Sequence, residues 1–266
     1  MNLAEQINIL ADFCGVRDID ELSSEALSRR YNFAQADIMV LFGGSILAGG
    51  DAFAESIRNQ VAKTYIIVGG AGHTTETLRR KMSKLYHNID TTNMSEAELF
   101  NEYIFKRYNL RADYLECSST NCGNNITYLL DLIDREKINC QSMILTQDAT
   151  MQRRMTAGLK KYRPEVLAIN FAAYRAKVVN ENSELNYDTE ILGMWNIERY
   201  VSLLLGEIPR LKDDVNGYGP KGKEFIAHVD IPQKVQAAFD EVSKYFKVRN
   251  AINDGKVSIF FGNNQQ

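Results

Sequence analysis

The chain has 266 residues, enough for one large domain or two small ones, and its 45% hydrophobic and 24% charged content is typical of a soluble globular protein. A net charge of −3 at pH 7 gives no general attraction for nucleic acid or an anionic membrane, so any anion site must be local. The first ten residues, MNLAEQINIL, lack a basic region, and no apolar run approaches the ~18 residues of a membrane span. We therefore expect a cytoplasmic protein with no secretory signal, no membrane span and no nucleic-acid partner.

Residues 1–36 have a helical pattern. Leu3, Ile7, Leu10 and Phe13 recur at three- and four-residue spacing, and a second helix is predicted over residues 20–31. This N-terminal segment is expected to pack on the core that the rest of the chain forms.

Residues 37–171 change to short apolar runs that alternate with amphipathic segments. Helices are predicted between the runs, and Ser95 and Glu98 have the spacing of a capping box at the start of one of them. The predicted strands cover residues 38–42, 65–68, 113–117, 142–146 and 165–171. Strands alternating with helices in this way predict an α/β fold, a Rossmann-like parallel sheet with helices on both faces.

Residues 172–266 are expected to form a mainly helical C-terminal extension. One long helix is predicted over residues 186–208, where a broad apolar stripe includes Trp195. A loop rich in Gly, Pro and charge follows over residues 209–225, and a last helix begins at Pro232.

Four predicted strand ends carry glycine, hydroxyl or amide side chains, at residues 43–45, 69–73, 118–121 and 147–150. Ligands of open parallel sheets bind beyond the carboxyl ends of the strands, where glycine allows close approach and helix N-termini hold anions. We predict a phosphate- or nucleotide-like ligand there, with purely structural turns as the alternative. The predicted ligand-binding residues are Gly43, Gly44, Ser45, Gly69, Gly70, Gly72, His73, Glu96, Thr120, Asn121, Asn124, Gln147, Asp148, Thr150 and Arg153.

Arg153 and Arg154 are expected in the first turn of a helix, shortly after the strand at residues 142–146. That position disfavours each cation by about 0.3–1 kcal/mol, because the unpaired N–H groups already make this end positive. A ligand phosphate or carboxylate held by Arg153 would explain the placement. In the alternative, Asp148 at the helix N-cap or Glu165 pairs with one arginine and the other is solvated.

His73 lies at a strand end and can act as an acid or base near neutral pH. Asp148 and Glu96 are its expected partners in proton transfer, with His73 and Asp148 as the catalytic candidates. A ligand contact without chemistry is the alternative for His73. Glu76 and Glu96 stand near helix starts, where a carboxylate stabilises the helix by itself.

No metal site is predicted from the sequence. Cys117 and Cys122 have C-x4-C spacing without a second pair, which is weak as a zinc signature. The run GYGPKGKE has Glu224 where a P-loop has Ser or Thr, and the surrounding segment has lysines where a calcium loop has carboxylates. We expect this run to fold over the site, with Tyr218, Lys221 or Lys223 near the ligand.

The strand ends resemble a known bacterial family. The matching pieces are DIMVLFGG (37–44), IIVGGAGH (66–73), SEAELF (95–100), SSTNCGNN (118–125) and ILTQDATMQRRM (144–155). They resemble the ElyC/SanA/YdcF family, a domain of unknown function, and residues 193–232 resemble its YdcF-like members in particular. The resemblance implies a Rossmann-like nucleotide-binding domain with S-adenosylmethionine or a related adenosine compound as the ligand. Family members tend to carry a histidine where this chain has Thr150, so chemistry that depends on that histidine is not expected here unless His73 takes its place.

Three functions are therefore considered. The first is a transferase or hydrolase acting on an adenosine-containing or phosphorylated small molecule. The second is a sensor or carrier that binds the same ligand without turnover. The third is an interaction protein that uses its C-terminal helices.

Overall fold

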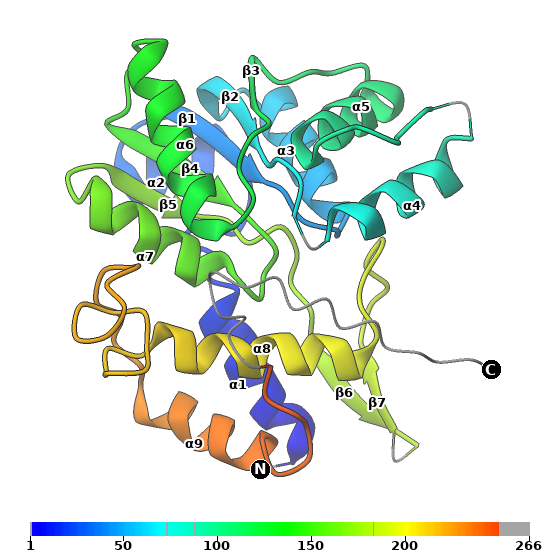
Figure 1. Cartoon of the computed structure of the whole chain (residues 1–266), viewed down its shortest axis with the longest axis vertical. Helices are drawn as coiled ribbons and strands as arrows, with labels where there is room; N and C mark the ends of the chain where they lie inside the picture. The colour runs from blue at the N-terminus through cyan, green and yellow to red at the C-terminus, as the bar shows by residue number, and fades with distance from the viewer. Residues whose placement is uncertain (1, 73, 88, 183, 250–266) are drawn as a thin grey trace.

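The computed structural model describes residues 2–72, 74–87, 89–182 and 184–249. Its centre is a five-stranded parallel sheet with strand order β3-β2-β1-β4-β5, as Figure 1 shows. The strands are β1 (Ala36–Phe42), β2 (Ala62–Val68), β3 (Tyr114–Glu116), β4 (Ser142–Thr146) and β5 (Leu167–Asn170). The α/β, Rossmann-like fold predicted from the alternating pattern is confirmed.

Helices cover both faces of this sheet because the central strands are apolar on both sides. Every residue of β1 is buried: Met39 and Leu41 belong to one core cluster, and Val40 and Phe42 belong to the opposite one. The first cluster includes side chains of α2 (Ser24–Tyr31), α3 (Ala48–Arg58), α4 (Thr75–Leu85) and α5 (Glu96–Tyr108). The second includes side chains of α6 (Cys122–Arg135) and α7 (Gln152–Tyr162).

The predicted capping box at the start of α5 is present. The Ser95 hydroxyl accepts from the Glu98 backbone N–H at 3.2 Å, and the Glu98 carboxylate accepts from the Ser95 N–H at 2.7 Å. These two bonds satisfy N–H groups that no helical carbonyl can reach. They fix the first residue of α5, Glu96, beside the end of β2.

A second body lies below the sheet in Figure 1 and has its own hydrophobic core. It contains α1 (Leu3–Cys14), α8 (Ile197–Leu211), α9 (Gln233–Val242) and the antiparallel pair β6 (Val178–Glu181) and β7 (Glu184–Tyr187). The N-terminal segment expected on the sheet as one unit divides between the two bodies. Leu22, just before α2, and Leu27, within α2, belong to the core of the sheet. Ile7 and Leu10 of α1 belong to the core that includes α8 and α9.

The long helix predicted over residues 186–208 is wrong in its first half. Residues up to Tyr187 belong to β7, which pairs with β6, and α8 begins only at Ile197. Asn196 sets this start because its side chain accepts from the Arg199 N–H at 2.8 Å. Trp195 therefore lies before the helix. No helix in the described part of the chain has both the length and the hydropathy of a membrane span.

Candidate functional site

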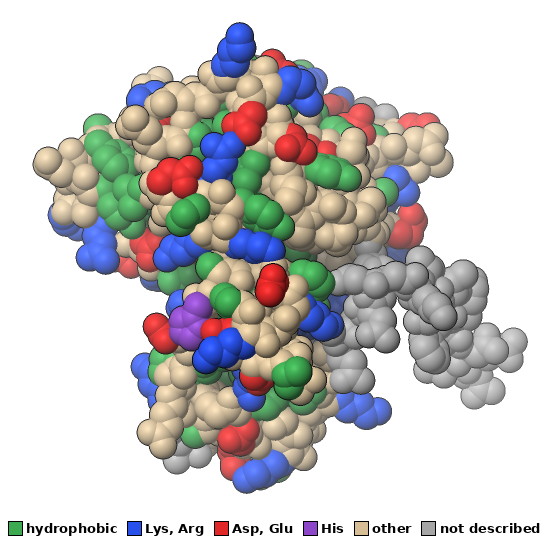
Figure 2. Space-filling view, turned by 60° about the vertical axis from the view of Figure 1, so that its left-hand side comes forward, with side chains coloured by type: hydrophobic (Ala, Val, Ile, Leu, Met, Phe, Trp, Pro, Cys, Tyr) green, Lys and Arg blue, Asp and Glu red, His purple; other side chains and the backbone are tan. Residues whose placement is uncertain are grey.

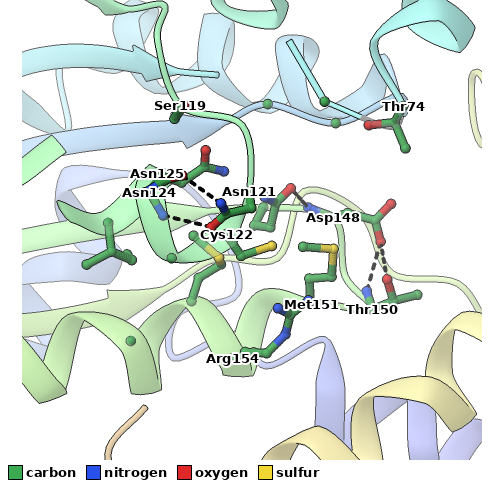
Figure 3. A pocket seen from close by; sticks show the side chains of 18 of the residues that line it. Thr74, Ser119, Asn121, Cys122, Asn124, Asn125, Asp148, Thr150, Met151 and Arg154 are labelled. Carbon is green, nitrogen blue, oxygen red and sulfur yellow. Dashed lines mark hydrogen bonds between the residues drawn. The ribbon is translucent and has the colours of Figure 1, made fainter. Parts of the chain in front are cut away.

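The two central strands create a crevice at the carboxyl edge of the sheet. The chain leaves β1 for β2 on one side and leaves β4 for β5 on the other, so the loops that follow β1 and β4 diverge. A cavity of about 670 Å³ opens there, between the sheet and the second body (Figure 3). Its volume lies in the range of about 300–1,000 Å³ that is usual for small-molecule sites.

The cavity brings together the loops at all four predicted strand ends. The predicted residues that line it are Gly43, Gly44, Ser45, Gly70, Gly72, Glu96, Thr120, Asn121, Asn124, Gln147, Asp148 and Thr150. Gly69 and Arg153 are not among the lining residues, and His73 lies outside the described residues. Of the loop residues expected near a ligand, Tyr218 lines the cavity and Lys221 and Lys223 do not.

Three buried polar atoms of the cavity wall have no hydrogen-bond partner among the described residues. They are Ser45 Oγ after β1, Gln147 Nε2 after β4 and Trp195 Nε1 before α8. Gln147 Oε1 accepts from the Asp148 backbone N–H at 2.6 Å, which fixes the amide so that its NH₂ is the unpaired group. Ser45 and Gln147 are each only 2% exposed. Buried polar groups normally have partners, so these three unpaired donors set this wall of the cavity apart.

Gln152, at the start of α7, holds the loop after β4 in place. This fully buried side chain accepts from the Gln147 N–H at 2.9 Å and donates to the carbonyl of Leu145 at 2.9 Å and to Asn170 Oδ1 at 3.1 Å. The amide therefore ties the end of β4 to the neighbouring strand β5. Nothing in the sequence pattern distinguishes Gln152 from a solvated helix residue, so this role was not predicted.

Asp148 is held by three hydrogen bonds to a single carboxylate oxygen. Its Oδ1 accepts from the Thr150 N–H at 2.9 Å, the Thr150 hydroxyl at 2.8 Å and the Tyr174 hydroxyl at 2.7 Å. Burial, and after it the Asp148 charge, raises the pKa of Tyr174 well above its usual range, so the phenol stays a donor. Asp148 is not the N-cap of α7, a position that Met151 takes. Figure 3 shows its second oxygen pointing away from Thr150.

Glu96 is the second carboxylate of the cavity, and it lies beside the end of β2. Its backbone N–H donates to the Gly70 carbonyl at 2.9 Å, and its Oε1 accepts from the hydroxyls of Thr74 and Thr75 at 2.9 Å each. Burial raises the pKa of this carboxyl, and the threonine hydrogen bonds oppose the rise only in part. Glu96 therefore does more than stabilise the start of α5, because it presents a buried carboxyl to the cavity.

Two of the glycines are required by contacts within the chain. A Cβ on Gly70 would lie 2.7 Å from the Cys117 carbonyl oxygen and 2.9 Å from the Ser118 carbonyl carbon, in the backbone after β3. A Cβ on Gly43 would lie 2.8 Å from Glu96 Cβ. At both positions glycine lets adjacent loops pack against one another, which differs from the close approach to a ligand that the sequence suggested.

The polar residues after β3 bond mainly to one another. Asn121 caps α6 by accepting from the Asn124 N–H at 3.0 Å, and its Nδ2 donates to Asn124 Oδ1 at 2.6 Å (Figure 3). The Thr120 hydroxyl also donates to Asn124 Oδ1, at 3.3 Å. These three side chains form a polar wall with a fixed shape.

The two arginines of α7 point in different directions, and the one expected at the ligand is turned away. Arg153 donates to the Phe13 carbonyl, and its guanidinium lies 4.2 Å from the centre of the Phe13 ring in α1. Arg154 lines the cavity and lies beside Met151 (Figure 3). Its Nε and Nη2 donate to the Glu207 carboxylate of α8 at 2.6 and 3.1 Å. Neither Asp148 nor Glu165 is the partner of these arginines, because α1 and α8 supply partners from the ends of the chain.

Lys81 connects the sheet to the segment that carries Trp195. Its Nζ donates to the carbonyls of Ser45 at 2.5 Å and Gly193 at 2.6 Å, and it lies 5.0 Å from the centre of the Trp195 ring. Burial lowers the pKa of this lysine. Lys81 thus holds two of the three unpaired donors in position. The sequence analysis missed this role, since a lysine in a helix normally extends into solvent.

The four cysteines are free, and Cys122 lines the cavity. Among the residues that the structure describes, no group of three or more His, Cys, Asp and Glu side chains is placed to hold a metal ion. No protein-family model matches the chain.

Proposed function

We propose that this protein binds a nucleotide-like or adenosine-containing anionic small molecule at the carboxyl edge of the sheet. The observation that carries the proposal is the set of three buried donors without partners, Ser45 Oγ, Gln147 Nε2 and Trp195 Nε1. An unpaired buried donor costs about 1–3 kcal/mol, so a ligand oxygen that pairs with it gains that amount of binding energy. Three such donors in one cavity select a ligand rich in acceptors.

Both carboxylates of the cavity suit the sugar of a nucleoside. In Rossmann-type sites an acidic residue near the second strand accepts from a ribose hydroxyl, and Glu96 lies beside the end of β2. Asp148 is fixed through one oxygen. Met151, Met155 and Ile126 supply apolar surface to the same cavity, which suits the faces of a base.

S-adenosylmethionine shares the adenosine part and a carboxylate with this ligand class, although its net charge is positive, and it is the ligand that the resemblance to the ElyC/SanA/YdcF family implies. We include membership of that family, and a cytoplasmic location, in the proposal. The four free thiols support a reducing compartment.

As an enzyme, the protein would be a transferase or hydrolase in which Asp148 moves a proton, with His73 as the second candidate. One observation favours a sensor or carrier as the second function. Thr150 stands where the family tends to have histidine, and its hydroxyl and N–H both donate to Asp148. The loop therefore carries a structural hydrogen bond where a titrating imidazole would otherwise stand.

Thermal-shift titration tests the binding proposal with S-adenosylmethionine, S-adenosylhomocysteine, adenosine, ADP, ATP and sugar nucleotides. A ligand at 100 times its dissociation constant adds about 2.7 kcal/mol to the free energy of unfolding. Mass spectrometry of the best ligand after incubation then separates turnover from binding alone. A protein that no member of the panel stabilises would contradict the proposal.

Two variants connect any binding to the unpaired donors. Gln147→Glu keeps the oxygen that accepts from Asp148 and replaces the NH₂ with a charged oxygen, while Trp195→Phe removes only the indole N–H. Each is expected to weaken binding at least about fivefold, the equivalent of one hydrogen bond. Gln141→Glu is the matched control, because Gln141 is exposed at the opposite end of β4. If both site variants bind with wild-type affinity, the Gln147 and Trp195 donors do not contact the ligand.

A further inference from the structure

The end of the cavity nearest the second body is lined by four arginines. They are Arg154 from α7, Arg199 and Arg210 from α8, and Arg249. We call these four residues the arginine cluster. The carboxylates that line the cavity, Glu96 and Asp148, belong to the strand-end loops on the sheet side. Figure 2 shows Lys and Arg side chains along the junction of the two bodies, on one face of the molecule.

Glu207 is the carboxylate that contacts the cluster, and it is 4% exposed. Both of its oxygens accept from Arg154, and its Oε1 lies 3.6 Å from Arg210 Nη1. One negative charge is thus shared between two of the four cations. Within the described part of the chain, neither Arg199 nor Arg249 forms an ion pair with a carboxylate.

Arg249 and Arg199 add positive charge to this end of the cavity. Burial, and then the neighbouring charges of Arg199 and Arg210, lowers the pKa of Arg249. Arg199 lies 5.6 Å from the centre of the Trp195 ring, and so next to the residue that holds one of the unpaired donors. Like charges raise each other's energy in a half-buried cavity, and an anion relieves this cost.

Close packing around Gly206 holds the cluster together. A Cβ at this position of α8 would lie 2.7 Å from Arg210 Nη1, 3.0 Å from Arg249 Cβ and 3.1 Å from the Arg249 carbonyl oxygen. The bare backbone of Gly206 therefore lets Arg249 lie directly against α8. Arg154, Arg210 and Arg249 converge on the same turn of this helix.

We propose that the arginine cluster binds the phosphate chain of the ligand, so that the ligand class is a nucleoside di- or triphosphate. This proposal rests on the proposed function, since the sheet end of the same cavity then holds the nucleoside. Guanidinium groups recognise phosphate with paired, charge-assisted hydrogen bonds, and several of them match the several charges of a polyphosphate. S-adenosylmethionine offers one carboxylate and a sulfonium cation, which the cluster repels. Phosphorylated adenosine compounds therefore bind more tightly than S-adenosylmethionine.

Calorimetric titration of the full chain with inorganic tripolyphosphate, adenosine, ADP and S-adenosylmethionine tests the proposal, with sodium chloride used to hold ionic strength constant. We expect tripolyphosphate to bind by itself and ADP to bind more tightly than adenosine. Arg199→Gln and Arg249→Gln are expected to weaken tripolyphosphate and ADP about tenfold or more and to leave adenosine unchanged. Arg163→Gln is the matched control, because Arg163 pairs with Asp134 and does not line the cavity. Arg199 is exposed, so its variant remains informative even if Arg249→Gln does not fold.

The outcomes separate the two proposals. The phosphate subsite is overturned, and the proposed function stands, if adenosine or S-adenosylmethionine binds while tripolyphosphate does not. The same conclusion follows if the affinity for ADP is unchanged in both arginine variants. Tripolyphosphate binding that depends on Arg199 and Arg249, with no binding of any adenosine compound, supports the subsite and overturns the proposed function.

Discussion

Ser45 and Ser56 are both buried, yet replacement by alanine is expected to have opposite effects at the two positions. The Ser56 hydroxyl donates to the Phe53 carbonyl at 2.6 Å, whereas the Ser45 hydroxyl has no partner among the described residues. A satisfied hydrogen bond contributes about 0.5–1.5 kcal/mol, so Ser56→Ala should lower the free energy of unfolding by that amount. A buried hydroxyl without a partner costs about 1–3 kcal/mol, so Ser45→Ala should leave the free energy of unfolding of the ligand-free protein unchanged or raise it by up to that amount.

Thermal and urea unfolding of the two variants measures the difference. For a protein of this size, 1 kcal/mol corresponds to about 2–4 °C in Tm. Titration with the ligand then reverses the order: Ser45→Ala should bind about two- to tenfold more weakly than wild type, and Ser56→Ala should bind as wild type does. The reasoning is refuted if Ser45→Ala is as destabilising as Ser56→Ala and binds the ligand with unchanged affinity.

Three further substitutions test the rest of the site. Arg154→Met removes the closer partner of the buried Glu207 and leaves its longer contact to Arg210, which should lower the free energy of unfolding in urea by about 3 kcal/mol. Adding Glu207→Leu should recover most of this loss. Equal stability of the single variant and wild type would contradict this account of the pair. Gly43→Ala places its Cβ against Glu96 Cβ and should lower Tm; Glu96→Gly removes that Cβ, so the double variant should lose less stability than the two single losses combined, and strictly additive losses would contradict this cause. Burial raises the pKa of Glu96, so the folded state holds the proton more tightly, and the ionised carboxylate destabilises the fold above that pKa. Glu96→Gln should therefore be more stable than wild type near pH 7, and this advantage should fade as the pH falls through the raised pKa. An advantage that does not vary with pH would point to another cause.

Lys81 provides a test of how the two bodies are joined at the site. Lys81→Met keeps much of the side chain's apolar surface but removes the donors to the Ser45 and Gly193 carbonyls. Two hydrogen bonds from a charged group should make the variant about 2–4 kcal/mol less stable and weaken ligand binding, because Ser45 and Trp195 lose their common anchor. Lys84→Met, at an exposed position of the same helix, is the control. Unchanged ligand affinity in Lys81→Met would show that the anchor is unnecessary.

The sequence by itself determined the sheet and the edge at which the cavity opens. Buried runs such as residues 38–42 and 142–146, each followed by a helix, require parallel strands covered on both faces, and the carboxyl ends of such strands meet at one edge. Local chemistry was also decisive where it acts within a few residues, as in the capping box of Ser95 and Glu98. For these reasons the four polar strand ends were placed around one cavity without knowledge of the coordinates.

Only the tertiary structure decided which arginine faces that cavity. Arg153 and Arg154 are adjacent in sequence, but neighbouring helix residues point about 100° apart, so the rotation of α7 about its axis places one against α1 and the other at the cavity. That rotation is fixed by Phe13 and Glu207, which come from near the two ends of the chain.

The same reason applies to Trp195 and Lys81. The residues around Trp195 fit a helical stripe, but pairing of β7 with β6 and capping by Asn196 place it in the segment before α8, where it lines the cavity. Periodicity reports which face of an element is apolar, whereas the partner that covers this face is chosen by packing between segments far apart in the chain. The sequence therefore located the cavity, and the contact between the sheet and the second body decided which charged and polar residues line it.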